Sequence, residues 1–225
     1  MQIPRIDEVY YPSDDSYLVI DYFDNSEFEK TLKLLSEFKK TINILDMGCG
    51  TGILGFCLTF KILYTKFFDK INLNFVDINS KAIETAKFMM NENFHYLKTL
   101  DGCKNEILNV DYHISNLFHE IPSKIYDIIV FNPPYLPQDD EIQNVLPIDQ
   151  ALYGGPNGIS ILRTFFERSK YYMSATSVVY FVASSLGTLR KLLPKISQEY
   201  QITLLQNLHM FFEDIALFAA QKSLI

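Results

Sequence analysis

The chain has 225 residues, of which 48% are hydrophobic, 14% aromatic and 21% charged, and its formal net charge is −7. This apolar content excludes a disordered chain, and an α/β fold of about 200 to 250 residues is usually one domain. The acidic balance counts against a protein that grips a phosphate backbone, so nucleic acid is the weaker expectation for a partner.

Targeting and metal-binding patterns are missing from the sequence. The N-terminus has no basic segment followed by an apolar one, and no uncharged apolar run reaches the ~20 residues that cross a bilayer. The cysteines at 49, 57 and 103 form no CxxC pair, and the four histidines have no ligand spacing. We therefore expect a soluble, cytoplasmic protein without membrane contact, disulfide framework or metal of its own.

Helical and strand periodicities alternate along the chain. Helices are predicted at 28–38, 53–64, 80–94, 159–173 and 186–197, with Ser80 as an N-cap and a break near Pro194. Strands are predicted at 41–46, 71–77, 110–115, 126–131, 177–184, 201–208 and 215–222. The order predicts an α/β, doubly wound, mostly parallel seven-stranded sheet that ends in an antiparallel C-terminal hairpin. The strand at 110–115 is predicted to be an edge.

A glycine-rich turn follows the first predicted strand. Asp46, Gly48, Gly50 and Gly52 form a DxGxGxG pattern, and Asp77 ends the second strand. Glycines in such a turn let a ligand approach the backbone, and the carboxylate can accept both ribose hydroxyls of an adenosine. The plain interpretation is a helix-entry turn beside a strand-end carboxylate. The pattern resembles motif I of class I S-adenosylmethionine-dependent methyltransferases, which implies a Rossmann-like fold with that cofactor.

A second motif, Asn132-Pro133-Pro134-Tyr135, follows the fourth strand. An amide or aromatic amine is a poor nucleophile because its lone pair is delocalised. If Asn132 Oδ1 and the Pro133 carbonyl accept the two N–H bonds of a planar NH2 group, they orient its nitrogen toward an electrophilic methyl. Tyr135 can stack on that group. The bland alternative is a stiff structural loop, but its place at the same sheet edge favours catalysis by Asn132, Pro133 and Tyr135.

With these motifs the chain resembles the HemK-like protein-glutamine N5-methyltransferases, in the short archaeal and eukaryotic branch that modifies class I translation termination factors. Val9-Tyr10 with Pro12 to Leu18, the double-glycine loop Ala151 to Gly158, and Phe211-Phe212-Glu213 are similar to that branch. Two departures are Asn116, where the family usually has Asp, and Tyr11, where the branch usually has Glu. Asp14 and Asp15 could also be helix N-caps, and the double-glycine loop could be a turn without a substrate role.

The resemblance implies roles for individual residues. Residues 1–40 would be an N-terminal extension and helix on the cofactor site, and 41–225 the methyltransferase domain. The Gly-Gly-Gln glutamine of the termination factor would be bound by Asn132, Pro133, Pro134 and Tyr135. The cofactor would be bound by Asp15, Ser16, Asp46, Gly48, Gly50, Gly52, Asp77, Ile78, Asn116, Leu117 and Asn132.

The branch also implies a partner, a small zinc-binding activator protein that covers a sheet edge in a heterodimer. Other interpretations stay open from the residues alone. NPPY chemistry also suits a nucleic-acid N6-adenine or N2-guanine methyltransferase, a lysine of another protein is a further substrate class, and a non-enzymatic cofactor-binding scaffold is the third.

Overall fold

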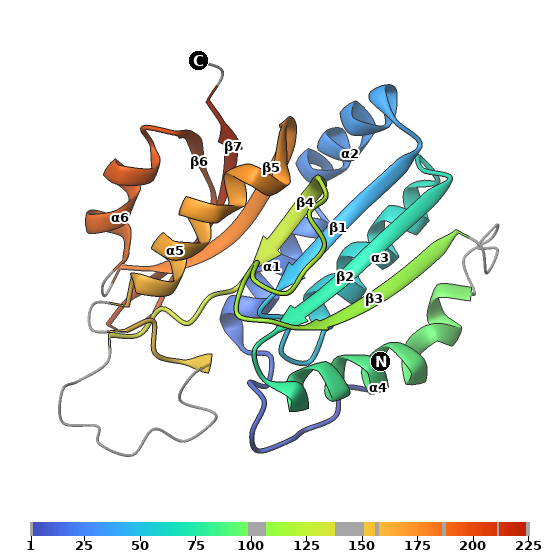
Figure 1. Ribbon diagram of the computed structural model, residues 1–225, viewed down its shortest axis with the longest axis horizontal. Helices are drawn as coiled ribbons and strands as arrows, with labels where there is room; N and C mark the ends of the chain where they lie inside the picture. The colour runs from blue at the N-terminus through green and yellow to red at the C-terminus, as the bar shows by residue number, and fades with distance from the viewer. Residues whose placement is uncertain are drawn as a thin grey trace.

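The computed structural model describes residues 2–98, 107–137, 151–155, 158–185, 188–210 and 212–223, with the backbone alone for Lys98 and residues 188–191. Its centre is a seven-stranded sheet in the order β3-β2-β1-β4-β5-β7-β6 (Figure 1). The strands are β1 Thr41–Met47, β2 Lys70–Asp77, β3 Leu108–Ile114, β4 Tyr126–Phe131, β5 Met173–Ser184, β6 Tyr200–His209 and β7 Asp214–Lys222.

Strand directions confirm the predicted sheet. β1 runs parallel to β2 and β4, β2 to β3, and β4 to β5. β7 runs antiparallel to both β5 and β6, so the chain ends in the expected hairpin. β3 and β6 are the two edges of the sheet, as predicted for β3.

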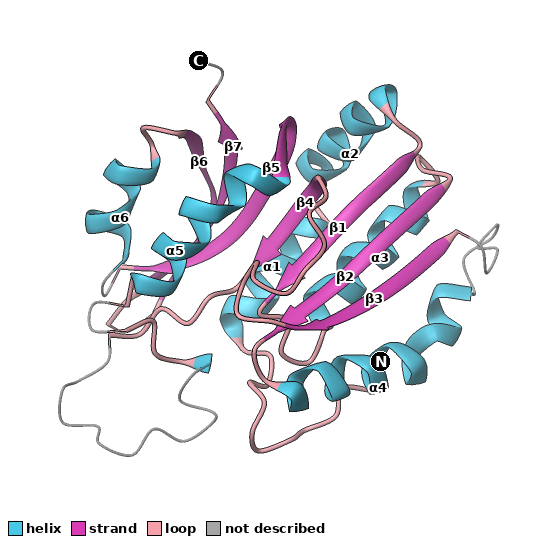
Figure 2. Cartoon of the chain, in the orientation of Figure 1, coloured by secondary structure: helices cyan, strands magenta, loops and turns pink. Residues whose placement is uncertain are grey.

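Helices cover both faces of this sheet (Figure 2). They are α1 Asp14–Phe23, α2 Ser26–Phe38, α3 Ile53–Thr65, α4 Ser80–Lys98, α5 Ser160–Ser169 and α6 Thr188–Ile196, with a 3-10 turn at Lys170–Tyr172. Side chains from α1 to α4 form one apolar core with the sheet, and those from α5 and α6 form a second core on its other face. In β1, Ile42 and Ile44 enter the first core while Leu45 and Met47 enter the second, because successive strand side chains face opposite ways.

The structure corrects four local predictions. Asn79, not Ser80, caps α4, because its Oδ1 accepts a hydrogen bond from the Lys81 N–H at 2.9 Å. Likewise α1 begins after Ser13, so Asp14 and Asp15 lie in its first turn instead of capping it. Pro194 does not break α6; the helix includes it and ends at Ile196, so the missing N–H falls in the last turn.

The helix predicted at 159–173 is also too long, since α5 ends at Ser169 and Met173 already belongs to β5.

The direction of the strands determines where the site lies. The carboxyl ends of β1, β2 and β4 meet near the lower centre of Figure 1, where the glycine turn and NPPY loop begin. In parallel α/β sheets this edge is where ligands bind.

Candidate active site

The glycine turn joins β1 to α3. Gly50 and Gly52 have φ angles of 52° and 80°, in the left-handed region that favours glycine. A Cβ on Gly52 would lie 2.9 Å from the Cβ of Ala86, so this glycine lets α3 and α4 pack closely. Gly50 instead has open space beside it. The nearest atom to a Cβ built on Gly50 would be the Tyr10 carbonyl oxygen, at 3.6 Å.

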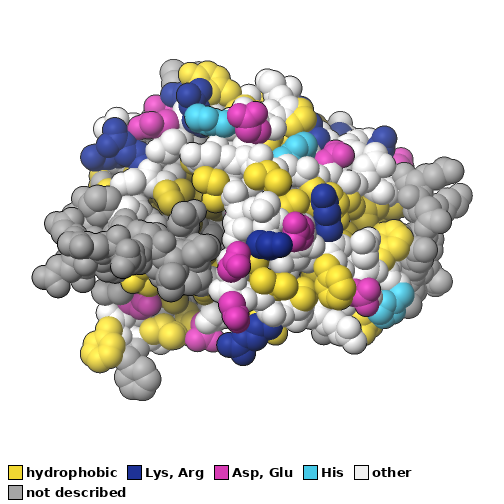
Figure 3. Space-filling model, turned by 60° about the horizontal axis from the view of Figure 1, so that its bottom comes forward, with side chains coloured by type: hydrophobic (Ala, Val, Ile, Leu, Met, Phe, Trp, Pro, Cys, Tyr) yellow, Lys and Arg dark blue, Asp and Glu magenta, His cyan; other side chains and the backbone are white. Residues whose placement is uncertain are grey.

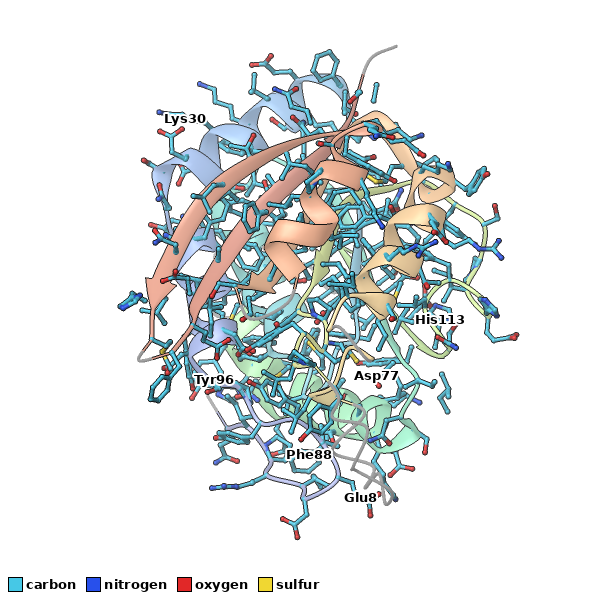
Figure 4. The ribbon with its side chains drawn as sticks, turned by 90° about the vertical axis from the view of Figure 1, so that its left-hand side faces the viewer. Glu8, Lys30, Asp77, Phe88, Tyr96 and His113 are labelled. Atoms are coloured by element: carbon cyan, nitrogen blue, oxygen red, sulfur yellow. The ribbon has the colours of Figure 1, made fainter. Side chains whose placement is uncertain are left out.

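Asp77 is held beside that turn by backbone donors. Its Oδ2 accepts from the Gly50 N–H and its Oδ1 from the Asn79 N–H, each at 2.9 Å. Burial raises the pKa of this carboxyl, and the N–H groups of Asn79, Gly50 and Ile78 oppose the rise. Each oxygen has a further lone pair, so the carboxylate can accept two ligand hydroxyls. In Figure 4, Asp77 lies in the lower part of the molecule, above Glu8.

Asp46 differs from Asp77 because it does not line the cavity. Its side chain is buried behind the turn, and Oδ2 accepts from the Gly55 N–H at 2.8 Å. This contact holds the first turn of α3. Burial raises the pKa of Asp46 well above its usual value. Among the residues predicted to bind the cofactor, Asp46 and Gly52 therefore support the turn from outside the cavity.

A cavity of about 560 Å³ opens at this sheet edge. The predicted residues in its wall are Ser16, Gly48, Gly50, Asp77, Ile78, Asn116, Leu117, Asn132 and Pro134. Asn116, where the sequence departs from the family it resembles, lies in the wall as predicted. Sequence reasoning did not single out several others as site residues, among them Glu8, Val9, Tyr10, Pro12, Leu54, Ala82 and Tyr153.

The N-terminal residues 2–12, which we call the strap, supply part of that wall. Asn93 of α4 accepts from the Gln2 N–H at 2.8 Å and donates to the Gln2 carbonyl at 2.7 Å. Before the first residue of α4, Asn79 Nδ2 donates to the Glu8 carbonyl at 2.8 Å. The strap is therefore anchored at two separate points along the helix. The only sequence signal for it was the Val9-Tyr10 signature, and no local pattern announced the asparagine anchors.

The NPPY loop faces the first turn of α1. Asn132 Nδ2 donates to Ser16 Oγ at 3.4 Å, and the Tyr135 hydroxyl donates to Asp15 Oδ2 at 3.1 Å. Asn132 Oδ1 is buried and has no hydrogen-bond partner among the described residues. A buried acceptor without a partner is costly and calls for an explanation, such as a ligand that donates to it.

A second hollow of about 40 Å³ adjoins the main cavity, because Tyr10, Asn132, Pro134 and Ala151 line both. Its remaining wall consists of Asp15, Pro133, Tyr135, Leu136 and Leu152. The structure thus brings Asp15 and the whole NPPY motif together around one small hollow. Asp15 lines this hollow and not the larger cavity, which differs from its predicted place on the cofactor.

The double-glycine loop packs against the NPPY backbone. A Cβ on Gly154 would lie 2.5 Å from the Pro134 carbonyl, and one on Gly158 would lie 2.2 Å from the Tyr135 carbonyl. Leu136 pairs with this loop through the N–H groups of Leu136 and Gly154, each bond being 3.0 Å long. The double-glycine loop is therefore a turn, as the alternative interpretation had it, and it supports the NPPY backbone. Residues 156 and 157 of the loop, Phe211 and Cys103 lie outside the described residues.

In the described part of the chain, no helix is long and apolar enough to cross a membrane. Nor do His, Cys, Asp and Glu side chains gather there in groups of three or more that could hold a metal ion.

The sheet order, glycine turn and strand-end carboxylate together define a class I methyltransferase fold, as the sequence predicted. The chain belongs to the methyltransferase small domain family, whose model matches residues 23–148. The prediction of an S-adenosylmethionine-dependent methyltransferase is thereby confirmed. The cavity also fits that cofactor, with a glycine cradle at one wall and a carboxylate for the ribose beside it.

Similar proteins span nearly the whole chain. A Methanocaldococcus jannaschii protein, provisionally named a protein N5-glutamine methyltransferase, is 28% identical over 96% of this chain and 92% of its own length. The catalytic subunit mtq2 of the Schizosaccharomyces pombe eRF1 methyltransferase is 26% identical over 85% of this chain and 79% of its own length. A release factor glutamine methyltransferase of Streptococcus pneumoniae is 28% identical over 66% of this chain and 48% of its own length.

Solved structures agree on the fold. The E. cuniculi Mtq2-Trm112 complex, which is responsible for methylation of the eRF1 translation termination factor, has a TM-score of 0.61 at 19% identity and covers 96% of this chain and 99% of that chain. The N-terminal domain of human METTL16 with S-adenosylhomocysteine has a TM-score of 0.55 at 14% identity, covering 97% of this chain and 75% of that one.

Proposed function

We propose that this protein transfers a methyl group from S-adenosylmethionine to the side-chain amide of the glutamine in the Gly-Gly-Gln motif of a translation termination factor. One observation carries the proposal: Asn132 Oδ1 is a buried acceptor without a partner among the described residues, at the junction between the main cavity and the small hollow. A planar NH2 group placed in the hollow would satisfy it. Two relatives named as glutamine methyltransferases and a third named as an eRF1 methyltransferase subunit support the same substrate.

The proposed cofactor site is the main cavity. Asp77 would accept the ribose hydroxyls, and Gly48 and Gly50 would let the ligand approach the turn. Ile78, Asn116 and Leu117, which line the cavity after the ends of β2 and β3, would contact the adenine, while Asp46 and Gly52 hold the turn. When bound, S-adenosylmethionine supplies an electrophilic methyl on its sulfonium. Residues 1–40 act as an N-terminal segment that completes the site, and 41–225 form the methyltransferase domain.

The NPPY loop orients the nucleophile. Asn132 Oδ1 and the Pro133 carbonyl accept the two amide N–H bonds, which aligns the nitrogen lone pair with the methyl. Pro134 stiffens the loop, and the Tyr135 ring stacks on the planar amide. The sulfur–carbon bond would break as the nitrogen–carbon bond forms, and the methylated amide would then release one proton to water. The two acceptors would stabilise the positive charge that develops on the nitrogen during the transfer.

A substrate panel tests this function. The purified protein, with and without its activator, is incubated with labelled cofactor and a termination factor, its Gly-Gly-Gln Gln→Arg variant, or RNA and DNA. We expect label only on the unaltered termination factor. Label on nucleic acid would support the N6-adenine or N2-guanine alternative, and label that persists in the Gln→Arg variant would point to lysine or another residue.

We also propose a heterodimer with a small zinc-binding activator, in the cytoplasm. β3 is an edge strand, and an edge can be extended by a strand of another chain. Ile114 at its end is 56% exposed although it is apolar. The E. cuniculi neighbour is a complex with a second protein, Trm112. Full activity and solubility of the isolated chain would contradict this proposal.

A further inference from the structure

Asp15 is a buried carboxylate at the small hollow, and the chemistry above gives it no task. Its Oδ1 accepts from the Ser16 N–H at 2.6 Å and from the Ser16 hydroxyl at 3.2 Å. Tyr10 donates to both oxygens at 3.1 and 3.0 Å, and Tyr135 donates to Oδ2 at 3.1 Å. Its partners are thus neutral donors from three separate segments of the chain.

The direction of these hydrogen bonds determines the direction of the next one. A carboxylate can only accept, so the Ser16 hydroxyl must donate its proton to Asp15. Toward Asn132, Ser16 Oγ can then only accept a hydrogen bond. The Asn132 Nδ2 group, which can only donate, lies 3.4 Å from that oxygen. The amide oxygen of Asn132 is thereby left on the other side, as the buried acceptor without a partner.

We propose that Asp15 is a positioning residue that acts through Ser16 Oγ to hold the Asn132 amide with Oδ1, and not Nδ2, toward the N–H of the substrate. This inference rests on the proposed function and deepens it. The two orientations of a carboxamide have almost the same shape, so packing cannot select between them. Hydrogen-bond direction selects, because a flipped Asn132 would present a donor to the donor of the substrate.

The same carboxylate also holds the aromatic part of the hollow. Burial, and then the Asp15 charge, raises the pKa of Tyr10 and Tyr135 above the usual tyrosine value. Both hydroxyls therefore keep their protons and remain donors to Asp15. The Tyr135 ring is held where it can stack on a planar group, so one carboxylate controls both Asn132 and Tyr135.

Matched variants of the activator-bound enzyme test whether Asp15 orients Asn132 through Ser16. Asp15→Ala removes the acceptor of the Ser16 hydroxyl, which is then free to donate to Asn132 and flip its amide. Ser16→Ala removes the hydroxyl itself. Asp14→Ala is the control, because Asp14 is exposed in the same first turn of α1 and its loss changes the helix charge equally.

The measurements are melting temperature, cofactor Kd, kcat and KM for the termination factor. We expect Asp15→Ala to lower kcat by roughly 100-fold, the scale of one oriented hydrogen bond lost from a transition state, with cofactor Kd nearly unchanged. Ser16→Ala should lower kcat in the same way, while Asp14→Ala retains activity. A wild-type kcat in Asp15→Ala, or a loss confined to cofactor Kd, overturns the proposal.

A second readout does not depend on turnover. With asparagine-labelled protein, a nuclear Overhauser contact between the Asn132 amide protons and Ser16 Hβ is expected in the wild type and weakened in Asp15→Ala. An undiminished contact in Asp15→Ala overturns the proposal. If the wild type fails to methylate the glutamine, the proposed function fails, and this contact alone decides whether Asp15 orients Asn132.

Discussion

At the residue scale, two carboxylates with similar sequence positions have different tasks. Asp46 is the penultimate residue of β1 and Asp77 is the last residue of β2. Asp77 lies in the cavity wall, whereas Asp46 accepts a hydrogen bond from the Gly55 N–H behind the turn. A motif pattern alone could not separate these roles, because the separation depends on which side of the turn each side chain occupies.

Asp77 should therefore control cofactor affinity. Asp77→Asn places an NH2 group toward the Gly50 N–H or the ribose hydroxyls and removes a charged acceptor worth about 1.5–3 kcal/mol. We expect the Kd for S-adenosylhomocysteine, measured by calorimetry, to rise by roughly 10- to 100-fold. Asp111→Asn, at an exposed carboxylate on neighbouring β3, serves as the control. Equal Kd values for Asp77→Asn and the wild type would contradict the assignment.

Asp46 should instead control stability in a pH-dependent way. Its pKa in the folded protein is raised by burial, so its contribution is fully present below the unfolded pKa of about 3.9 and is lost as pH rises through the folded pKa. Asp46→Asn keeps an acceptor for Gly55 without the buried charge. We expect its melting temperature to exceed that of the wild type at neutral and alkaline pH, with the difference shrinking in acid. A constant loss at every pH would refute this.

At the element scale, the strap is the part of the site that could not be predicted from the sequence. Gln2 and Asn93 lie 91 residues apart, and their paired hydrogen bonds depend on how α4 packs, so no periodicity can reveal them. The strands and helices were predicted well for the opposite reason. Buried runs such as β4, whose residues are all buried, carry their burial in their own composition.

Loss of the strap anchor should speed cofactor exchange. Asn93→Ala removes the bonds to the Gln2 backbone and costs about 1–3 kcal/mol of unfolding free energy, because the side chain is fully buried. We expect stopped-flow measurements to show faster S-adenosylhomocysteine dissociation. Asn25→Ala removes the cap of α2, which should lower stability without changing that rate. Unchanged dissociation in Asn93→Ala would show that the strap does not retain the ligand.

The two edge strands offer a matched test of partner docking. Ile114 on β3 and Leu204 on β6 are each 56% exposed. If the activator covers β3, Ile114→Lys should weaken the heterodimer by roughly 10- to 100-fold, which corresponds to burying one aliphatic side chain. Leu204→Lys should leave it intact. The affinity for the activator is measured by calorimetry. If only Leu204→Lys lowers it, the partner binds at the opposite edge of the sheet.

At the scale of the whole molecule, the surface agrees with a protein substrate. Figure 3 shows acidic and basic side chains interspersed among apolar ones on the face it presents. A net charge of −7 points the same way, because phosphate-backbone binding relies on clustered positive charge. Sequence reasoning reached the fold, the family and the NPPY loop. It missed the Asp15 contacts because Tyr10, Asp15 and Tyr135 come together only when the strap, α1 and the loop after β4 meet.

The most direct test of the central claim is tandem mass spectrometry of the termination-factor peptide that contains the Gly-Gly-Gln motif. Wild-type enzyme and Asn132→Ala are compared at saturating S-adenosylmethionine, with cofactor Kd measured for both. We predict one added methyl, localised by fragmentation to the glutamine side chain, for the wild type. For Asn132→Ala we predict none, at nearly unchanged Kd. A methyl on another residue, or full methylation by Asn132→Ala, would contradict the account.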